Sequence, residues 1–257
     1  MAHKLLMLSM MPTNLARAIL LTLPLALLPL TMNPTEAFAA AAQADPAYEH
    51  LAPASPDPAL PNVLLLGDSI SIGYQPFVTK ALAGVANVYR IKGSEEMTVR
   101  PKNGLRLSTD SALANLDGWL GNVKFSVIHF NWGLHDVKQQ SGKPTQQVPL
   151  EEYKTNLRQL VHRLKATGAR LIWATTTPVP PGADQGPTGR KAAAELPYNE
   201  AALQIMKEEG IPVNDLHALV APRLKEAQRP ANVHFTDAGS KMLGEQVAGE
   251  IRKALGK

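Results

Sequence analysis

The sequence predicts an α/β protein, a three-layer α/β/α sandwich around a five-stranded parallel sheet, on three observations. Short apolar segments recur along the chain, longer segments with helical periodicity separate them, and the apolar segments are continuous rather than alternating. Continuous apolar strands are typical of parallel sheets that helices cover on both faces. Short right-handed connections between such elements favour a flavodoxin-like strand order, 2-1-3-4-5.

Two segments precede the predicted domain at residues 62–257. Residues 1–39 have the layout of a signal peptide: basic residues, an apolar run, and the small-residue site Ala37-Phe38-Ala39. An uncleaved membrane anchor is the alternative, but about 15 apolar residues broken by two prolines fall short of the ~20 that span a bilayer. Residues 40–61 are rich in alanine and proline, which predicts a flexible linker. We therefore expect a periplasmic or secreted protein with no stable membrane insertion after cleavage.

The elements of the domain follow in chain order. Strands are expected within residues 62–69, 86–91, 125–133, 170–179 and 210–215. The clearest helical pattern covers residues 151–168, where acids lead, one apolar stripe follows and Gly168 closes the C-terminus. A last helix follows Thr236, which we interpret as its N-cap. Its predicted inner face is apolar and consists of Met242, Leu243, Val247, Ile251 and Leu255.

Composition narrows the classes of function. The formal net charge of +4 is mild and no basic run is interleaved with aromatic residues, so we expect no nucleic-acid partner. The chain has no cysteine, which excludes disulfides and thiolate zinc sites. No spacing of histidine and carboxylate residues resembles a metal site. We expect neither a metal nor another cofactor.

Ser69 directly follows the first predicted strand and precedes a helical segment. Its hydroxyl would project from the carboxyl edge of the sheet, where the open N–H groups of a helix start can stabilise an oxyanion. Serine is also a common helix cap, so a capping role is the alternative. The segment is not a GxSxG elbow, because residue 71 is serine.

Two further residues point to the same crevice. Asn131 ends the third predicted strand, next to the first in the proposed order, where its amide could donate to the same oxyanion. The alternative is a turn bond that ends the strand. Gly104 lies in the loop after the second strand, where a residue without a side chain lets a backbone N–H approach a bound acyl group.

His234 lies in a loop that the last helix returns to the carboxyl edge of the sheet. Its place two residues before the predicted N-cap favours a neutral imidazole, because the positive end of the helix dipole disfavours imidazolium. A loop histidine bonded to backbone is the alternative. Among the other histidines, His129 is interpreted as a core residue, and His162 has no assigned role. His135 and Asp136 either line the substrate pocket or belong to a solvated loop.

Four segments carry a resemblance to a known family: GDSIS at 67–71, NG at 103–104, HFNWG at 129–133 and VHFTDAG at 233–239. Their order and spacing resemble the blocks of the SGNH hydrolases, also called GDSL esterases, over about residues 62–256. The resemblance implies that Ser69 is the nucleophile and His234 the general base. It also implies an oxyanion hole formed by the N–H groups of Ser69 and Gly104 and the amide of Asn131.

The chain departs from the family at one position. Members usually carry an aspartate two or three residues before the histidine, where this chain has Asn232 and Ala231. In a serine protease, replacing the triad aspartate by asparagine costs about 10⁴ in kcat. Asn232 can instead present its carbonyl oxygen to the Nδ1–H of His234, as in Cys-His-Asn enzymes, and a backbone carbonyl is the other candidate.

Our hypothesis is a Ser-His dyad, weaker than a full triad, that hydrolyses small acyl esters through an acyl-serine. The expected substrate is an acetyl ester on carbohydrate, by family analogy. Two alternatives stay open: a lipid or lysophospholipid acylhydrolase, and a non-catalytic carbohydrate-binding relative.

Overall fold

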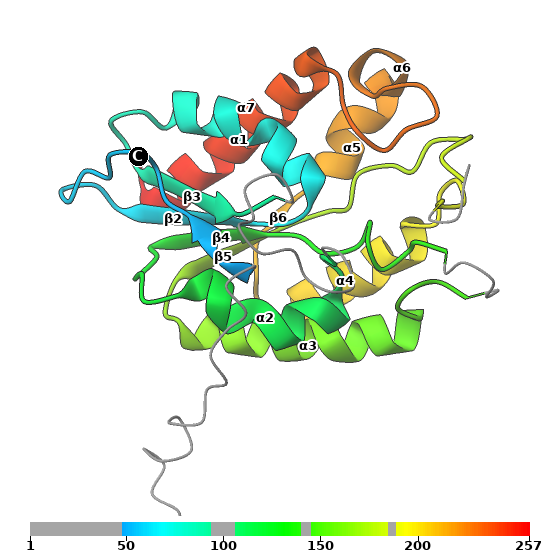
Figure 1. Cartoon of the computed structure of the whole chain (residues 1–257), viewed down its shortest axis with the longest axis horizontal. Helices are drawn as coiled ribbons and strands as arrows, with labels where there is room; N and C mark the ends of the chain where they lie inside the picture. Colours follow the sequence, from blue (N-terminus) through cyan, green and yellow to red (C-terminus); the bar gives the residue numbers. More distant parts are fainter. Residues whose placement is uncertain (1–47, 94–105, 140–144, 185–188) are drawn as a thin grey trace, which may run out of the picture. The chain divides into compact units, whose positions relative to one another are not determined.

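The computed structural model describes residues 48–93, 106–139, 145–184 and 189–257. Within these residues one sheet of six strands runs in the order β1-β3-β2-β4-β5-β6 (Figure 1). Its strands are β1 (His50–Leu51), β2 (Asn62–Leu66), β3 (Asn87–Ile91), β4 (Val127–Phe130), β5 (Arg170–Ala174) and β6 (Val213–Asn214). The last five pair in parallel. This confirms the predicted α/β fold and its parallel strand order 2-1-3-4-5.

One strand of the sheet, β1, was not predicted from the sequence. It pairs antiparallel with β3 at the edge of the sheet, and a hydrogen bond of 2.9 Å joins Nδ1 of His50 to the carbonyl of Trp119. Tyr48 is buried just before it. The segment predicted as a linker thus contains a strand at residues 50–51, which was not foreseen because two residues are too few to show a strand period. The remainder of the linker and the predicted signal peptide, residues 1–47 together, lie outside the described residues.

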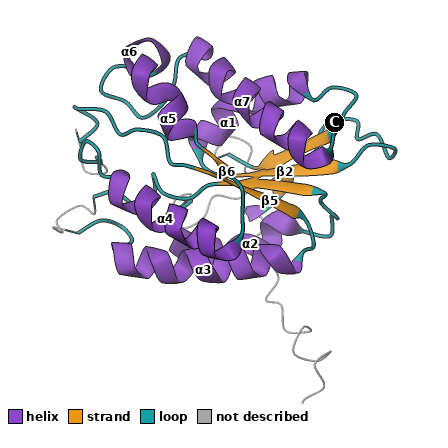
Figure 2. Ribbon diagram, turned by 180° about the vertical axis from the view of Figure 1, so that it is seen from behind, coloured by secondary structure: helices purple, strands orange, loops and turns teal. Residues whose placement is uncertain are grey.

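Helices cover both faces of the sheet (Figure 2). On one face lie α1 (Ser69–Ala81), α5 (Leu216–Val220), the short 3₁₀ helix η2 (Ala221–Arg223), α6 (Leu224–Ala227) and α7 (Asp237–Leu255). On the other lie α2 (Thr109–Leu120), α3 (Leu150–Ala166) and α4 (Leu196–Glu209). The three-layer sandwich that the sequence predicts is thus present. No helix among the described residues has the length and apolar character needed to cross a bilayer.

The two helices that showed the clearest patterns form as predicted. In α3 the apolar stripe is fully buried, and it consists of Tyr153, Leu157, Leu160, Val161 and Leu164. The α7 helix starts at the predicted cap, because Oγ1 of Thr236 accepts a hydrogen bond of 3.1 Å from the N–H of Gly239. Leu243, Val247 and Ile251 from its inner face have no exposed surface. Burial of these stripes, rather than helix propensity alone, holds both helices on the sheet.

The topology brings the ends of β2 and β4 together. These strands are neighbours, and the N–H of Asn131 donates a 3.0 Å hydrogen bond to the carbonyl of Leu66 just beyond the paired residues. The helix after β2, α1, and the helix after β4, α3, lie on opposite faces of the sheet. The chain therefore leaves a crevice at the carboxyl ends of these two strands, where ligands bind in open α/β sheets.

Candidate active site

Ser69 is the first residue of α1, three residues after the end of β2. The N-cap is its neighbour Asp68, whose Oδ1 accepts a hydrogen bond of 2.9 Å from the N–H of Ile70. The capping role considered for Ser69 thus belongs to Asp68. This leaves the serine hydroxyl free for another partner. The N–H of Ser69 faces no acceptor among the described residues, as expected of an open first turn.

His234 is the partner of that hydroxyl. Its Nε2 lies 2.8 Å from Oγ of Ser69, although 165 residues separate the two in sequence. The fold therefore brings the predicted nucleophile and base into proton-transfer distance. Burial lowers the pKa of His234, and the nearby charges of Arg190, Arg229 and Lys138 lower this pKa further, against the opposing effect of Asp68. The imidazole is consequently neutral near pH 7 and able to accept a proton.

Asn232 orients this imidazole. Its Oδ1 lies 2.8 Å from Nδ1 of His234 and accepts a second bond of 2.9 Å from the backbone N–H of the same residue. A backbone N–H only donates, so the amide atom that faces it is the oxygen. That oxygen in turn requires the proton of His234 on Nδ1, which leaves Nε2 unprotonated toward Ser69. Of the two candidates from the sequence, the asparagine side chain rather than a backbone carbonyl holds the ring.

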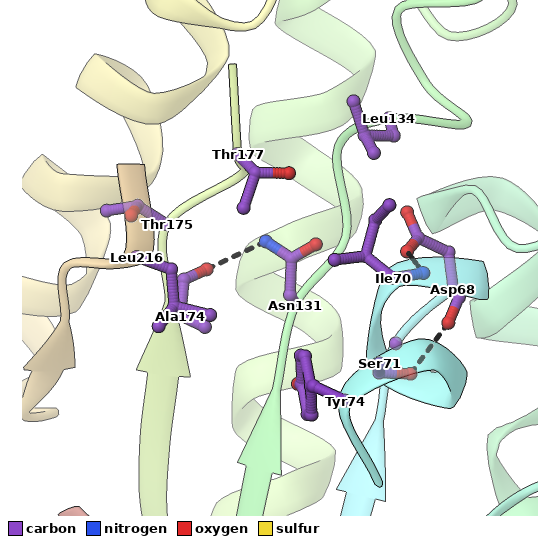
Figure 3. A pocket seen from close by; sticks show the side chains of 11 residues that line it. Asp68, Ile70, Ser71, Tyr74, Asn131, Leu134, Ala174, Thr175, Thr177 and Leu216 are labelled. Carbon is purple, nitrogen blue, oxygen red and sulfur yellow. Dashed lines mark hydrogen bonds between the residues drawn. The ribbon is translucent and has the colours of Figure 1, made fainter. Parts of the chain in front are cut away.

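Asn131 does not offer a free donor to Ser69. Its amide nitrogen donates to the carbonyl of Ala174 at 2.7 Å (Figure 3). It also donates to Oγ1 of Thr176 at 3.1 Å, which uses both amide protons inside the protein. The space beside it measures only about 10 Å³, room for one water. The side chain thus ties the end of β4 to that of β5. Gly104, the other oxyanion residue expected from the sequence, lies outside the described residues.

The sequence profile of the GDSL-like lipase/acylhydrolase family matches residues 65–242, a span that contains Ser69, Asn232 and His234. The chain belongs to this family. Its chemistry is accordingly that of an acylhydrolase, an enzyme that cleaves ester bonds. A comparison of the sequence with functionally curated proteins finds no match.

Solved structures with the same fold include several esterases. A lipase/acylhydrolase from Enterococcus faecalis is 19% identical, with a TM-score of 0.60 over 75% of this chain and 96% of that one. An acetylxylan esterase from Geobacillus stearothermophilus is 21% identical, with a TM-score of 0.56 over 74% of this chain and 94% of that one. The acetyl xylan esterase AlAXEase is 13% identical, with a TM-score of 0.55 over 74% and 99%. At these identities the likeness establishes the fold.

The segment after β4 carries two further polar residues, His135 and Asp136. Asp136 is fully buried, and its Oδ1 accepts hydrogen bonds from the N–H of Thr109 at 2.9 Å and from its hydroxyl at 2.6 Å. Burial raises the pKa of Asp136 to about 7. A solvated loop is therefore the wrong interpretation of this residue. Polar residues directly after a buried strand are the sequence signal for such a site.

His135 follows Leu134 in the segment after β4, and the charge of His234 is among the causes that lower its pKa. Burial is the main cause that holds the pKa of His135 well below its ordinary value, so its ring is neutral. Its Nδ1 accepts a hydrogen bond of 3.3 Å from the backbone N–H of Leu107. The ring then carries its own proton on Nε2. This acylhydrolase thus has a neutral N–H donor at His135, one of the two residues that the sequence suggested for the substrate pocket.

The dyad opens into a small pocket. Ser69 and His234 line a cavity of about 170 Å³ together with Arg229, Phe235 and Asp237 among others. Among the residues that the structure describes, no cluster of histidine and carboxylate side chains is arranged to hold a metal ion. The groups present can take up a proton, attack a carbonyl and donate hydrogen bonds, which is the chemistry of acyl transfer.

Proposed function

We propose that this acylhydrolase is an exported serine esterase that removes small acyl groups, above all acetyl, from carbohydrate. The observation that carries the proposal is the relay from Ser69 through His234 to Asn232, with both links 2.8 Å long. A nucleophile, a base and a group that fixes the base are the minimum that ester hydrolysis through a covalent intermediate requires.

The reaction proceeds in two steps. His234 Nε2 takes the hydroxyl proton while Oγ of Ser69 attacks the ester carbonyl, and the protonated ring then gives this proton to the leaving alcohol oxygen. The acyl group remains on Ser69. A water molecule attacks the acyl-serine, again with His234 as base, and the tetrahedral intermediate releases the acid and restores the hydroxyl. Asn232 keeps Nδ1 protonated throughout but supplies no charge to stabilise the imidazolium.

Three N–H groups are proposed to bind the oxyanion. The backbone N–H groups of Ser69 and Gly104 are two of them, and Nε2–H of His135 takes the side-chain role first expected of Asn131. His135→Ala should then lower kcat by about 10²-fold or more with KM little changed, as loss of an oxyanion donor does. Asn131→Ala should act mainly on the melting temperature. Equal kcat losses in the two variants would remove His135 from this role.

Two observations support a small acyl group on a sugar. The pocket at Ser69 is about 170 Å³, a size that suits a short acyl group. Two of the similar structures are named as acetyl xylan esterases. Export rests on the signal-peptide layout of residues 1–39.

The test is covalent labelling of the serine. An organophosphorus ester should modify Ser69 in the parent, detected by mass spectrometry, and His234→Ala should slow this labelling strongly while the folded protein persists. A panel of nitrophenyl esters should show rates that fall as the acyl chain lengthens from acetyl. Absence of labelling, together with sugar binding, would favour the non-catalytic alternative. Faster hydrolysis of long chains would favour the lipid acylhydrolase.

A further inference from the structure

Three cationic side chains gather around the dyad without a carboxylate partner: Lys138, Arg190 and Arg229. The charge of each acts on the pKa of His234, so all three lie within electrostatic reach of the ring. The ion pairs among the described residues include none of them. Arg106, whose charge also reaches Lys138, differs because it pairs with Asp110.

Two of these cations are held in place by the backbone. Nε of Arg190 donates a 2.5 Å hydrogen bond to the carbonyl of Leu134, directly before His135. The N–H of Gln139 bonds to the carbonyl of Gly189 at 2.9 Å and joins the segments that carry Lys138 and Arg190. Nζ of Lys138 itself lies 3.4 Å from Nδ1 of His135. Both cations are therefore fixed on the segment of Leu134 and His135, and Leu134 lines a small pocket together with Asp68 and Ile70 at the start of α1.

Placing these cations together is costly in the absence of an anion. Burial, together with the charge of the neighbouring Arg190, lowers the pKa of Lys138 to about 8. The compensating charge nearby is Asp68, which is buried and already caps α1. One carboxylate faces two cations, Lys138 and Arg190. Unpaired, partly buried charges of one sign at a site are retained where a ligand of opposite charge binds.

We infer that Lys138, Arg190 and Arg229 form an anion subsite, and that the natural ester is carried by a negatively charged sugar such as a uronic acid. This inference rests on the proposed function and names the substrate class of the same site. The planar fork of arginine matches a carboxylate, and lysine adds a point charge.

Arg229 extends the subsite away from Ser69. It lines the 170 Å³ pocket of the dyad and also an open groove of about 660 Å³ beside it. Arg223 and Lys225 line the same groove, where the single acid is Glu226. Beyond the reacting ester the groove thus carries three cations and one acid on a lining that otherwise consists mostly of proline, alanine and leucine. A glycan chain with several charged units fits this surface better than a neutral chain does.

The experiment compares three acetyl esters that differ only at C6 of the sugar: methyl glucoside, methyl glucuronoside and methyl glucoside 6-phosphate. The parent should hydrolyse the glucuronoside with a kcat/KM about tenfold above that of the glucoside, mainly through KM, and this preference should shrink as NaCl rises. Lys138→Gln and Arg190→Gln should reduce the ratio toward one, and Arg190→Lys should retain part of it. Lys191→Gln, at the exposed neighbouring position, is the matched control and should change neither value.

The outcomes separate the subsite from the esterase. Equal rates for glucoside and glucuronoside, or an unchanged ratio in Lys138→Gln, would overturn the subsite while the esterase stands. A preference for the phosphate over the uronate supports the anion subsite and identifies its anion as phosphate. If no ester is hydrolysed, the proposed function fails. In that case, calorimetry with free glucuronate and free glucose tests the subsite. The anion subsite requires that glucuronate binds, that glucose does not, and that Lys138→Gln weakens the binding of glucuronate.

Discussion

At the scale of single residues, the chemistry depends on what Asn232 does for His234. A triad aspartate fixes the tautomer of the ring and also stabilises its positive charge. Asn232 performs the first task, since its Oδ1 holds Nδ1 at 2.8 Å, and it is uncharged. The cations around the ring add to the cost of charging it. The dyad therefore has a correctly oriented base whose protonated form is poorly stabilised.

Asn232→Asp should supply the missing charge. We expect kcat for a simple acetate ester to rise at least tenfold, and by less than the ~10⁴ that separates aspartate from asparagine in a serine protease, because the tautomer is already correct here. The carboxylate should also raise the pKa of His234. The base must be neutral, so the acid limb of the pH–rate profile should move to higher pH.

Steady-state rates from pH 4 to 9 for both proteins measure this change. Asn232→Ala is the matched variant that removes the holder altogether, and it should be slower than the parent. An aspartate variant that is no faster, with an unmoved acid limb, would show that Asn232 does not occupy the place of the triad carboxylate.

The sequence could predict Ser69, His234 and Asn232 because each stands in a short segment next to a strand end or a helix start. It could not predict how Asn131 bonds. Whether an amide at a strand end faces the substrate or the next strand depends on the carbonyl of Ala174, which is 43 residues away and unknowable from local pattern. The same holds for the cap of α1, where Asp68 and Ser69 compete at adjacent positions.

At the scale of elements, the dyad is positioned by the packing of α1 against α7. Ser69 begins the first of these helices, and His234 lies three residues before the second. The two helices approach each other closely at Gly244 of α7. A Cβ added there would lie 2.9 Å from the carbonyl oxygen of Tyr74 and 2.7 Å from Cβ of Phe77, both in α1. The absence of a side chain there sets the distance between the two helices.

Gly244→Ala should destabilise the protein by about 1–3 kcal/mol, because a methyl group at this point forces the helices apart. Gly249→Ala in the same helix is the matched control, since an added Cβ there meets nothing within 4 Å. That variant should gain up to about 1 kcal/mol from helix propensity alone. Urea unfolding of the three proteins gives these differences.

The esterase rate of the folded Gly244→Ala protein adds a second measurement. A shift of α7 moves His234 away from Ser69, so kcat should fall beyond what the folded fraction explains. A variant as stable and as active as the parent would mean that the α1–α7 distance does not set the geometry of the dyad.

Elements with many residues on one buried face were the most predictable. The apolar stripe of α3 could be predicted because the helical spacing of its apolar residues recurs several times. The cap of α7 could be predicted because threonine is a preferred N-cap residue. The strand β1 was not, since its two residues pair only because the edge of β3 is present. Alanine and proline content around it indicated a linker, and tertiary pairing overrode that local signal.

At the scale of the whole molecule, buried titratable groups determine how stability responds to pH. His129 has no exposed surface, its Nε2 lies 3.1 Å from Nδ2 of Asn214, and its Nδ1 has no partner in the structure. Burial lowers its pKa from 6.5 to about 3. Burial raises the pKa of Asp136 in the opposite direction, from 3.8 to about 7.

These two groups act on stability with opposite sign between pH 7 and pH 4. As pH falls below 6.5 the unfolded chain takes up a proton at position 129 that the folded protein excludes, so folding loses about 3 kcal/mol by pH 4. Over the same range the folded protein binds a proton at Asp136 that the unfolded chain still releases, so folding gains a similar amount. The small net change of this pair hides two large contributions.

Single substitutions should expose them. His129→Gln, which stays neutral, should lose about 3 kcal/mol less than the parent between pH 7 and pH 4. Asp136→Asn should lose more than the parent by a similar amount, because the group that favours the folded state in acid is gone. His162→Gln, on the exposed side of α3, should follow the parent. Urea unfolding at both pH values measures each difference, and parallel losses in all four proteins would show that neither buried group controls the acid response. The difference between pH values is the informative quantity, since a core substitution also changes stability by a pH-independent amount that cancels in it.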